Sequence, residues 1–315
     1  MWIRWLKLAL VFSSIFLLAA CELPFKDLLS KATEEVSQNA TEDPLQTAQP
    51  ETDALPEEMD AHDLALNPCD NVFYPLVPGN QWVYRVNQEE TEIAVTPDPA
   101  DNANQLGITV ASVENSQATL DSMEMSTGVI TQTLVECENG AIKNFPLLTL
   151  SIIFGDQVNG SVNAEYQDGV FAPPQADLVS KDWIHTWEGN YLLKGNFQAQ
   201  SEEDMVTLTI ADSPLKLLWE TEGIREPVEV PAGSFPNAIR VERDAEMNIS
   251  AEFDADGEVL QVNAVLSFKN TLWYEPYVGL LKEEIHDATI KYRGMSFPVM
   301  VNGDVELIEF RPASK

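Results

Sequence analysis

From residue 69 onward, apolar and polar residues alternate along the chain, and this period of two limits the fold more than any other feature. Apolar residues occupy every second position from 247 to 253 and again, after the turn residues 254–257, from 260 to 268. Successive side chains of a β-strand point to opposite faces, so the pattern predicts strands with one buried face. Two such strands joined by an acidic turn that ends in glycine predict an antiparallel hairpin.

The same alternation recurs in residues 206–210 and 288–292 and around Trp82. Short segments rich in Gly, Asn, Asp and Pro separate these strands, and helical periodicity is nearly absent. A parallel βαβ arrangement needs crossover helices, so it is excluded. We therefore predict an all-β domain over residues 69–311, built as an antiparallel curved sheet in an open half barrel or a sandwich. A proline-rich break near 171–182 would divide it into two sub-sheets.

The N-terminal sequence predicts export. Two basic residues precede an apolar run, which is the pattern of a secretory signal peptide over residues 1–20. The run is too short for a stable transmembrane helix, which needs about 20 apolar residues. It ends in the sequence LAAC, which resembles the lipobox of bacterial lipoproteins. The resemblance implies cleavage before Cys21 and acylation of Cys21 with chains such as palmitate. It also implies the extracytoplasmic side of the cell membrane or outer membrane, and Glu22 leaves that choice open.

The next segments predict a tether. Apolar residues at helical spacing within 21–38 indicate a short amphipathic helix at the membrane interface or a weakly helical piece of tether. Residues 39–68 are rich in Thr, Glu, Asp, Pro and Gln, and no Lys or Arg lies between Lys31 and Arg85. Such a segment buries too little apolar surface to offset its ordering entropy. We predict a disordered acidic linker that holds the folded domain away from the bilayer.

The charge of the chain excludes one class of partner. There are 51 acidic and 18 basic residues, which give a formal net charge of −33. Nucleic-acid binding needs a basic surface that neutralises phosphates, so nucleic acid is excluded. The same charge repels anionic lipid headgroups, so membrane attachment is expected to come from the lipid on Cys21 and not from the protein surface.

Cys69 and Cys137 are the other cysteines of the chain. In an oxidising extracytoplasmic compartment, two remaining cysteines favour one disulfide. Their separation of 68 residues says nothing about their proximity in space. Two separate buried thiols are therefore the alternative.

Three segments carry a family resemblance. They are YPLVPGNQWVYRV at 74–86, VPAGSFPNAIRVE at 230–242 and WYEPYVGLLKEE at 273–284. Their order and spacing resemble uncharacterised bacterial secreted proteins and lipoproteins with a β domain. They are similar, more distantly, to the half-barrel lipoprotein-carrier proteins of the periplasm, whose curved sheet holds acyl chains. Tyr277 departs from the pattern, which has Gly or another small residue there, and its bulk would narrow or cap a concavity in the sheet.

No catalytic motif is present in the sequence. The chain lacks GxSxG, HExxH, CxxC and the phosphate-binding GxxxxGK[ST] motif. Its three histidines, His62, His185 and His286, have no metal-ligand spacing. We therefore predict a protein that is not an enzyme and that has no cofactor and no metal.

Aromatic residues are the remaining candidates for a binding site. Trp183, Trp187, Trp273 and Tyr277 suit a concave face that accepts apolar chains or sugar rings, although large rings also fill the core of a β domain. We predict a binding or carrier module for a hydrophobic or glycan ligand, which requires an apolar cavity lined by Trp and Tyr. The alternative is an envelope scaffold that binds another protein through an exposed apolar patch or sheet edge.

Overall fold

The structure is a computed structural model that describes residues 67–88, 105–125, 128–148, 158–200, 205–255, 258–299 and 303–313. The predicted signal peptide, Cys21, the segment 21–38 and nearly all of the linker 39–68 lie outside these residues. Within the described ranges, no helix is long and apolar enough to cross a membrane.

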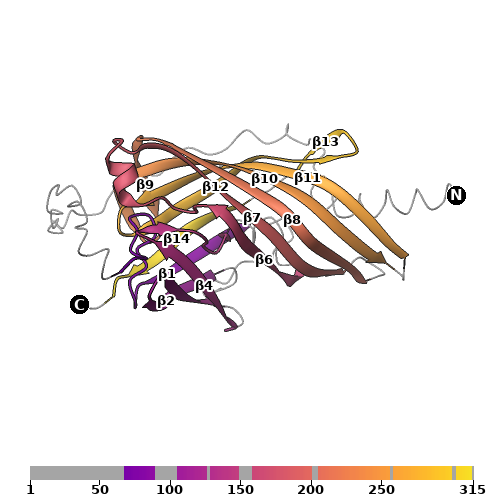
Figure 1. The fold of residues 1–315 in the computed structure, drawn as a ribbon, viewed down its shortest axis with the longest axis horizontal. Coiled ribbons are helices and arrows are strands. Elements are labelled where there is room, and N and C mark those ends of the chain that lie inside the picture. Colours follow the sequence, from indigo (N-terminus) through magenta and orange to yellow (C-terminus); the bar gives the residue numbers. More distant parts are fainter. Residues whose placement is uncertain are drawn as a thin grey trace, which may run out of the picture. The chain divides into compact units, whose positions relative to one another are not determined.

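Strands make up almost all of the regular structure (Figure 1). In chain order the elements are β1 (Gln81–Gln88), β2 (Gln105–Glu114), β3 (Gln117–Glu124), β4 (Ile130–Glu138), β5 (Ala141–Ile142), β6 (Val158–Gly169), α4 (Gln175–Val179), β7 (Ile184–Gln200), β8 (Met205–Glu222), β9 (Arg225–Val230), β10 (Gly233–Ala255), β11 (Glu258–Glu275), β12 (Gly279–Tyr292), β13 (Met295–Pro298) and β14 (Gly303–Arg311). The predicted all-β fold is confirmed.

The strands form one sheet in the order β5-β4-β3-β2-β1-β14-β12-β11-β10-β8-β7-β6, with β13 beside β12 and β9 beside β10. The strand pairs are antiparallel. The sheet is curved and open (Figure 1), which confirms the prediction of an antiparallel curved sheet. Residues 171–182, the expected break, link β6 to β7, and these two strands pair with each other within the same sheet.

The hairpin predicted from the alternating pattern is β10 with β11. The two strands pair along their length, from Ile239 opposite Tyr274 to Ala255 opposite Glu258. Every second residue of β10 from 239 to 247 is buried. The period of two therefore places one face of the hairpin in the core, which we call the inner face of the sheet.

The two ends of the strand order meet at one end of the sheet, which we call the closed end. Ile142 of β5 forms an antiparallel bridge to Ala172, just after β6, and the Phe171 N–H donates to the Ile142 carbonyl at 2.7 Å. A disulfide joins Cys69 to Cys137, and Cys137 pairs with Ile142. Beyond this bridge, β6 pairs with β7 alone among the described strands. The sheet is thus closed at one end and open at the other, as in a half barrel.

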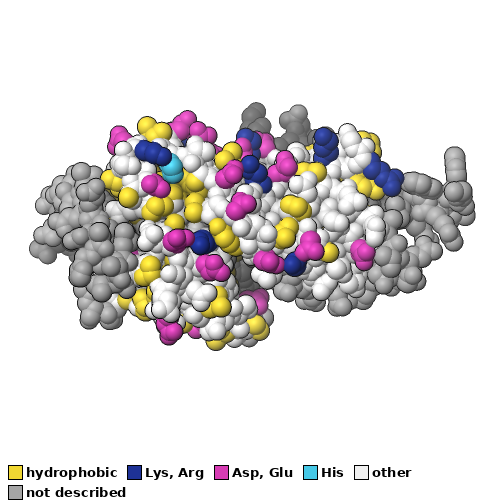
Figure 2. All heavy atoms as spheres, in the orientation of Figure 1, with side chains coloured by type: hydrophobic (Ala, Val, Ile, Leu, Met, Phe, Trp, Pro, Cys, Tyr) yellow, Lys and Arg dark blue, Asp and Glu magenta, His cyan; other side chains and the backbone are white. Residues whose placement is uncertain are grey.

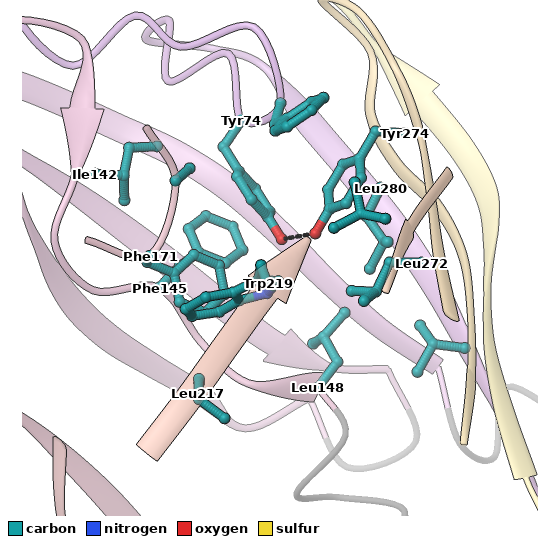
Figure 3. Packing of buried hydrophobic residues seen from close by; sticks show 14 of the residues in the cluster. Tyr74, Ile142, Phe145, Leu148, Phe171, Leu217, Trp219, Leu272, Tyr274 and Leu280 are labelled. Carbon is teal, nitrogen blue, oxygen red and sulfur yellow. Dashed lines mark hydrogen bonds between the residues drawn. The ribbon is translucent and has the colours of Figure 1, made fainter. Parts of the chain in front are cut away.

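Aromatic rings fill the inner face at the closed end (Figure 3). The segment before β1 contributes Phe73 and Tyr74. The Phe73 ring centroid lies 4.6 Å from that of Tyr274, and the Tyr74 ring lies 4.3 Å from Phe145. Trp219 of β8 is 1% exposed and is among the largest fully buried side chains. Such rings bury large apolar areas, so this end holds the main core.

Candidate ligand-binding face

Toward the open end, the inner face is apolar and many of its side chains are short. Its buried residues come from β7, β8, β10, β11 and β12, and we call them the inner strip: Leu193, Ile210, Met247, Ala251, Val262, Ala264, Leu266 and Ala288. The register places Ala251 between Ile210 of β8 and Val262 of β11. Among the described residues, Ala251, Val262 and Ala264 are buried without belonging to the core cluster of the closed end. The strip therefore extends the apolar face beyond that core.

A buried polar network lies on the same face of β10, between the closed end and the inner strip. Arg243 Nη2 donates to Glu283 Oε1 of β12 at 2.5 Å, and Asn270 Nδ2 of β11 donates to the same oxygen at 2.6 Å. Arg243 and Glu283 are each 2% exposed. Charges buried this deeply are tolerated only when they are paired at hydrogen-bonding distance, because desolvation opposes their burial.

Tyrosine hydroxyls lie near this network. The hydroxyl groups of Tyr74 and Tyr274 point toward each other at 2.7 Å (Figure 3). Burial raises the pKa of Tyr74 well above its usual value, and the neighbouring Tyr274 raises it further. Burial likewise raises the pKa of Tyr84 and Tyr274. These side chains therefore stay protonated at neutral pH, and their hydroxyl groups remain able to donate hydrogen bonds.

The network borders a small cavity of about 10 Å³. Its lining includes Tyr74, Tyr84, Arg243, Glu283 and Phe145. A space of this size holds about one water molecule. It is too small for a lipid or a sugar ring, so the closed end is a filled core at this point.

Trp183 and Trp187, two of the predicted ligand-lining residues, lie in this filled core, 8% and 7% exposed. Both contact Phe73, at ring-centroid distances of 5.9 and 6.3 Å. Trp187 also stacks on Trp219 with an interplanar angle of 8°, and its indole N–H donates to the Phe171 carbonyl at 3.1 Å. Both side chains therefore contribute to packing at the closed end.

Trp273 and Tyr277, the other two predicted residues, have different surroundings. Trp273 lies on the outer face of β11, where its indole N–H donates to the Glu226 carboxylate and the Lys282 ammonium lies 5.9 Å from its ring centroid. Tyr277 lies in the turn between β11 and β12, and its hydroxyl donates to Gln175 of α4 at 3.0 Å. The structure thus places one of these rings on the outer face and the other in a turn.

Arg243, Glu283 and Asn270 were not among the residues predicted from the sequence to form a site. A signal was present for Arg243, which occupies an inward position of β10 between the buried Val241 and Ala245. A charged residue at an inward position of an alternating strand requires a buried partner. That partner could not be identified from the sequence, because it lies 40 residues away on another strand.

The outer face carries a hollow of about 470 Å³ near the open end. Its polar lining comes from Asn248 and Ser250 of β10, Asn263 of β11, Lys291 of β12 and Arg293 in the turn that follows. Within the described part of the chain, neither Lys291 nor Arg293 forms an ion pair. This hollow is therefore locally basic, although the chain as a whole has a net charge of −33.

The histidines of the described region lie in separate settings. The His185 ring stacks on Trp187 at 5.9 Å between centroids, and burial lowers the pKa of His185, as does the nearby Lys181 ammonium. His286 Nε2 lies 3.1 Å from Thr271 Oγ1. No group of three or more His, Cys, Asp or Glu side chains that could hold a metal occurs in the part of the chain that the structure describes. His62 lies outside it.

No protein-family model matches the chain, and no curated protein matches its sequence. Two solved structures resemble it. One is a Bacteroides fragilis protein described as exported and as having a YmcC-like fold, with 11% identity over 77% of this chain and 100% of that chain and a TM-score of 0.37. The other is a Parabacteroides distasonis protein described as a lipoprotein, with 14% identity over 76% of this chain and 99% of that chain and a TM-score of 0.37. Similarity at this level does not bear on function.

Proposed function

We propose that the chain is an exported bacterial lipoprotein, anchored through acyl groups on Cys21 in the cell membrane or outer membrane. Its half barrel binds the acyl part of a lipid and catalyses no reaction. The observation that carries this proposal is the inner strip, which is apolar and of which Ala251, Val262 and Ala264 lie outside the packed core cluster. An acyl chain on this strip would remove its methylene groups from water, at about 0.8 kcal/mol each.

A lipid fits this face better than a glycan. Sugar rings stack on exposed aromatic planes and need hydrogen-bonding partners beside them. Trp183 and Trp187 are instead covered by Phe73, and every member of the inner strip is apolar. We therefore assign the hydrophobic ligand to the inner face.

The alternative function, an envelope scaffold that binds a protein, rests on a different surface. Val129, Ile130 and Leu134, on or beside β4, are 58%, 62% and 55% exposed. In the described structure, β4 pairs along this stretch with β3 only. An exposed apolar patch at a sheet edge is a common site for a protein partner. The Ile130→Ser/Leu134→Ser double variant would abolish such binding and leave lipid binding intact.

Lipid occupancy tests the main proposal. The mature chain from residue 21, with Cys21→Ser so that it carries no acyl group, is expressed with export and measured by native mass spectrometry. We expect a bound lipid mass that is lost on denaturation. Ala251→Trp would place a large ring on the inner strip and lower occupancy. Glu252→Trp, the next residue on the exposed outer face, is the matched control and retains the lipid.

The fold of each variant is checked by near-ultraviolet circular dichroism. If Ala251→Trp does not fold, the smaller change Ala264→Leu tests the same strip. A bare mass that also fails to take up added lysophospholipid would exclude the carrier function and favour the scaffold. Equal occupancy in Ala251→Trp and Glu252→Trp would show that lipid binds elsewhere.

A further inference from the structure

The β12–β13 hairpin, residues 288–298, exposes large apolar side chains at the open end. We call this hairpin the lip. Phe297 pairs with Ile290 and Met295 with Tyr292, so the four side chains share one face. Ile290 pairs in turn with the inner-strip residue Leu266, so this is the inner face. Met295 is 55% and Phe297 39% exposed.

The opposite face of the lip is basic. Lys291 and Arg293 line the outer hollow, beside Asn248 and Asn263. Figure 2 shows Lys and Arg side chains near the end of the sheet that carries β13, on a molecule with a net charge of −33. The lip thus has exposed apolar side chains on one face, Lys291 on the other, and Arg293 in its turn, where the guanidinium lies 5.1 Å from the centroid of the Tyr292 ring.

We propose that the lip contacts the surface of a phospholipid bilayer and passes acyl chains to the inner strip. Met295 and Phe297 enter the interfacial region, and Lys291 and Arg293 face the lipid phosphates. Apolar side chains flanked by Lys and Arg are typical of segments that lie at a lipid–water interface, because the charged ends stay in water while the apolar parts enter the bilayer. The outer hollow, at about 470 Å³, provides space for a headgroup beside these cations. The passage of acyl chains rests on the proposed function, whereas contact with the bilayer does not.

The acidic net charge does not prevent this contact. Exposed charges more than about 8 Å apart are largely screened at physiological ionic strength. Lys291 and Arg293 are the charged residues among those that line the outer hollow, so they set the charge presented there, although acidic residues elsewhere repel the membrane over longer distances at low salt.

The position of the predicted anchor favours the same partner. Cys21 and the first described residue, Asn67, are 46 positions apart. A flexible chain of that length would have an end-to-end distance of about 35 to 40 Å. An acyl group on Cys21 would therefore keep the domain at a high effective concentration near a bilayer. The chain enters the domain beside Cys69 at the closed end, so the domain must turn its open end toward the bilayer for the lip to make contact.

Three measurements on the mature Cys21→Ser chain test the proposal. The first is co-flotation with vesicles of phosphatidylethanolamine and phosphatidylglycerol. The second is the rate at which a pyrene-labelled phospholipid is extracted from these vesicles. The third is equilibrium binding of a lysophospholipid below its critical micelle concentration. We expect Met295→Ser/Phe297→Ser and Lys291→Glu/Arg293→Glu each to lower flotation and extraction by about tenfold or more. We expect Met295→Ser/Phe297→Ser to leave lysophospholipid binding unchanged.

The controls lie elsewhere on the surface. Ile130→Ser/Leu134→Ser removes similarly exposed apolar side chains from β4, and Lys181→Glu reverses a charge near α4; both are expected to float like the wild type. The lip proposal is overturned if the wild type does not float, or if the lip variants float and extract as well as these controls. If flotation depends on the lip but lysophospholipid does not bind, membrane contact stands and the lipid-binding function is wrong.

Discussion

The buried ion pair of Arg243 and Glu283 gives a sharp test of how this fold is stabilised. Glu283→Gln keeps the size of the side chain and removes its charge, so Arg243 loses its anionic partner while it remains 2% exposed. Breaking a buried pair on one side costs about 3 to 5 kcal/mol. Because Asn270 and the amide of the new side chain can still form a hydrogen bond, we expect the lower value, about 3 kcal/mol of unfolding free energy.

Urea denaturation followed by tryptophan fluorescence measures this loss directly. The melting temperature should fall by about 6 to 12 °C, since 1 kcal/mol shifts a domain of 150 to 250 residues by about 2 to 4 °C. Glu188→Gln, which removes a similar charge from the exposed pair with Lys216, is the control and should have no measurable effect.

A triple apolar variant separates two interpretations of the network. Arg243→Met/Asn270→Leu/Glu283→Leu removes the charges together with the amide, whose Oδ1 has no hydrogen-bond partner in the described structure. Replacing a whole buried network by apolar side chains is often neutral or stabilising, so we expect a stability within about 1 kcal/mol of the wild type. A loss of less than about 1 kcal/mol in Glu283→Gln, or a triple variant as unstable as Glu283→Gln, would contradict a stabilising role for the charge pairing.

Three further outcomes follow from the structure. Reducing the Cys69–Cys137 disulfide, which closes a loop with a sequence separation of 68, should lower the unfolding free energy by about 4 kcal/mol, and an unchanged urea midpoint in reductant would contradict this. Burial raises the pKa of Tyr74 and Tyr274, so the unfolded chain releases these protons first. The unfolding free energy should therefore keep its full value below pH about 10 and decrease above it by up to about 1.4 kcal/mol per pH unit for each tyrosine. A phenolate absorbance that rises before the protein unfolds would disprove this prediction. Each pair of methylenes added to a lysophospholipid should tighten binding about fifteenfold, measured by displacement of a fluorescent fatty acid, and affinity independent of chain length would exclude an acyl site.

The alternating pattern predicted the strands well wherever one face of the sheet is buried. The alternation around Trp82 predicted a strand with one buried face, and Trp82 and Tyr84, two positions on, are both 2% exposed. β10 and β11 pair across the expected turn. These elements could be predicted because burial of one face of a strand requires apolar and polar residues to alternate along the sequence.

The full extent of β8 could not be predicted from this pattern. The alternating pattern predicted a strand over 206–210, but the strand continues through Asp212 and Pro214 to Glu222. Asp212 has a φ of 44°, and the register with β7 and β10 shifts at this point, as in a β-bulge. The Ser250 N–H donates to Ser213 Oγ at 2.9 Å and so keeps a partner at the irregularity. A bulge admits turn residues inside a strand, and it depends on a neighbouring strand that the local sequence does not reveal.

Tyr277 has a structural explanation that the sequence did not offer. Its φ is 63°, in the left-handed region that favours glycine, which accounts for the small residue expected at this position. The adjacent Gly279 has a φ of 116°, and a Cβ there would lie 3.1 Å from Nε1 of Trp82. Trp82 in turn donates to the Val278 carbonyl at 2.6 Å. Two of the segments that carry the family resemblance therefore meet at the closed end, where they fix a turn and a packing contact.

The residues that stand out in the sequence and the residues of the proposed ligand-binding face are thus different sets. Large rings stand out because they fill the core, and glycines stand out because they allow turns; the structure places them at the closed end. Ala251 and Ala264 of the inner strip have no chemical signature, and only the register of β8, β10 and β11 shows that they share a face. Substitutions chosen from the sequence would therefore report mainly on stability, whereas substitutions chosen from the register would test the proposed binding.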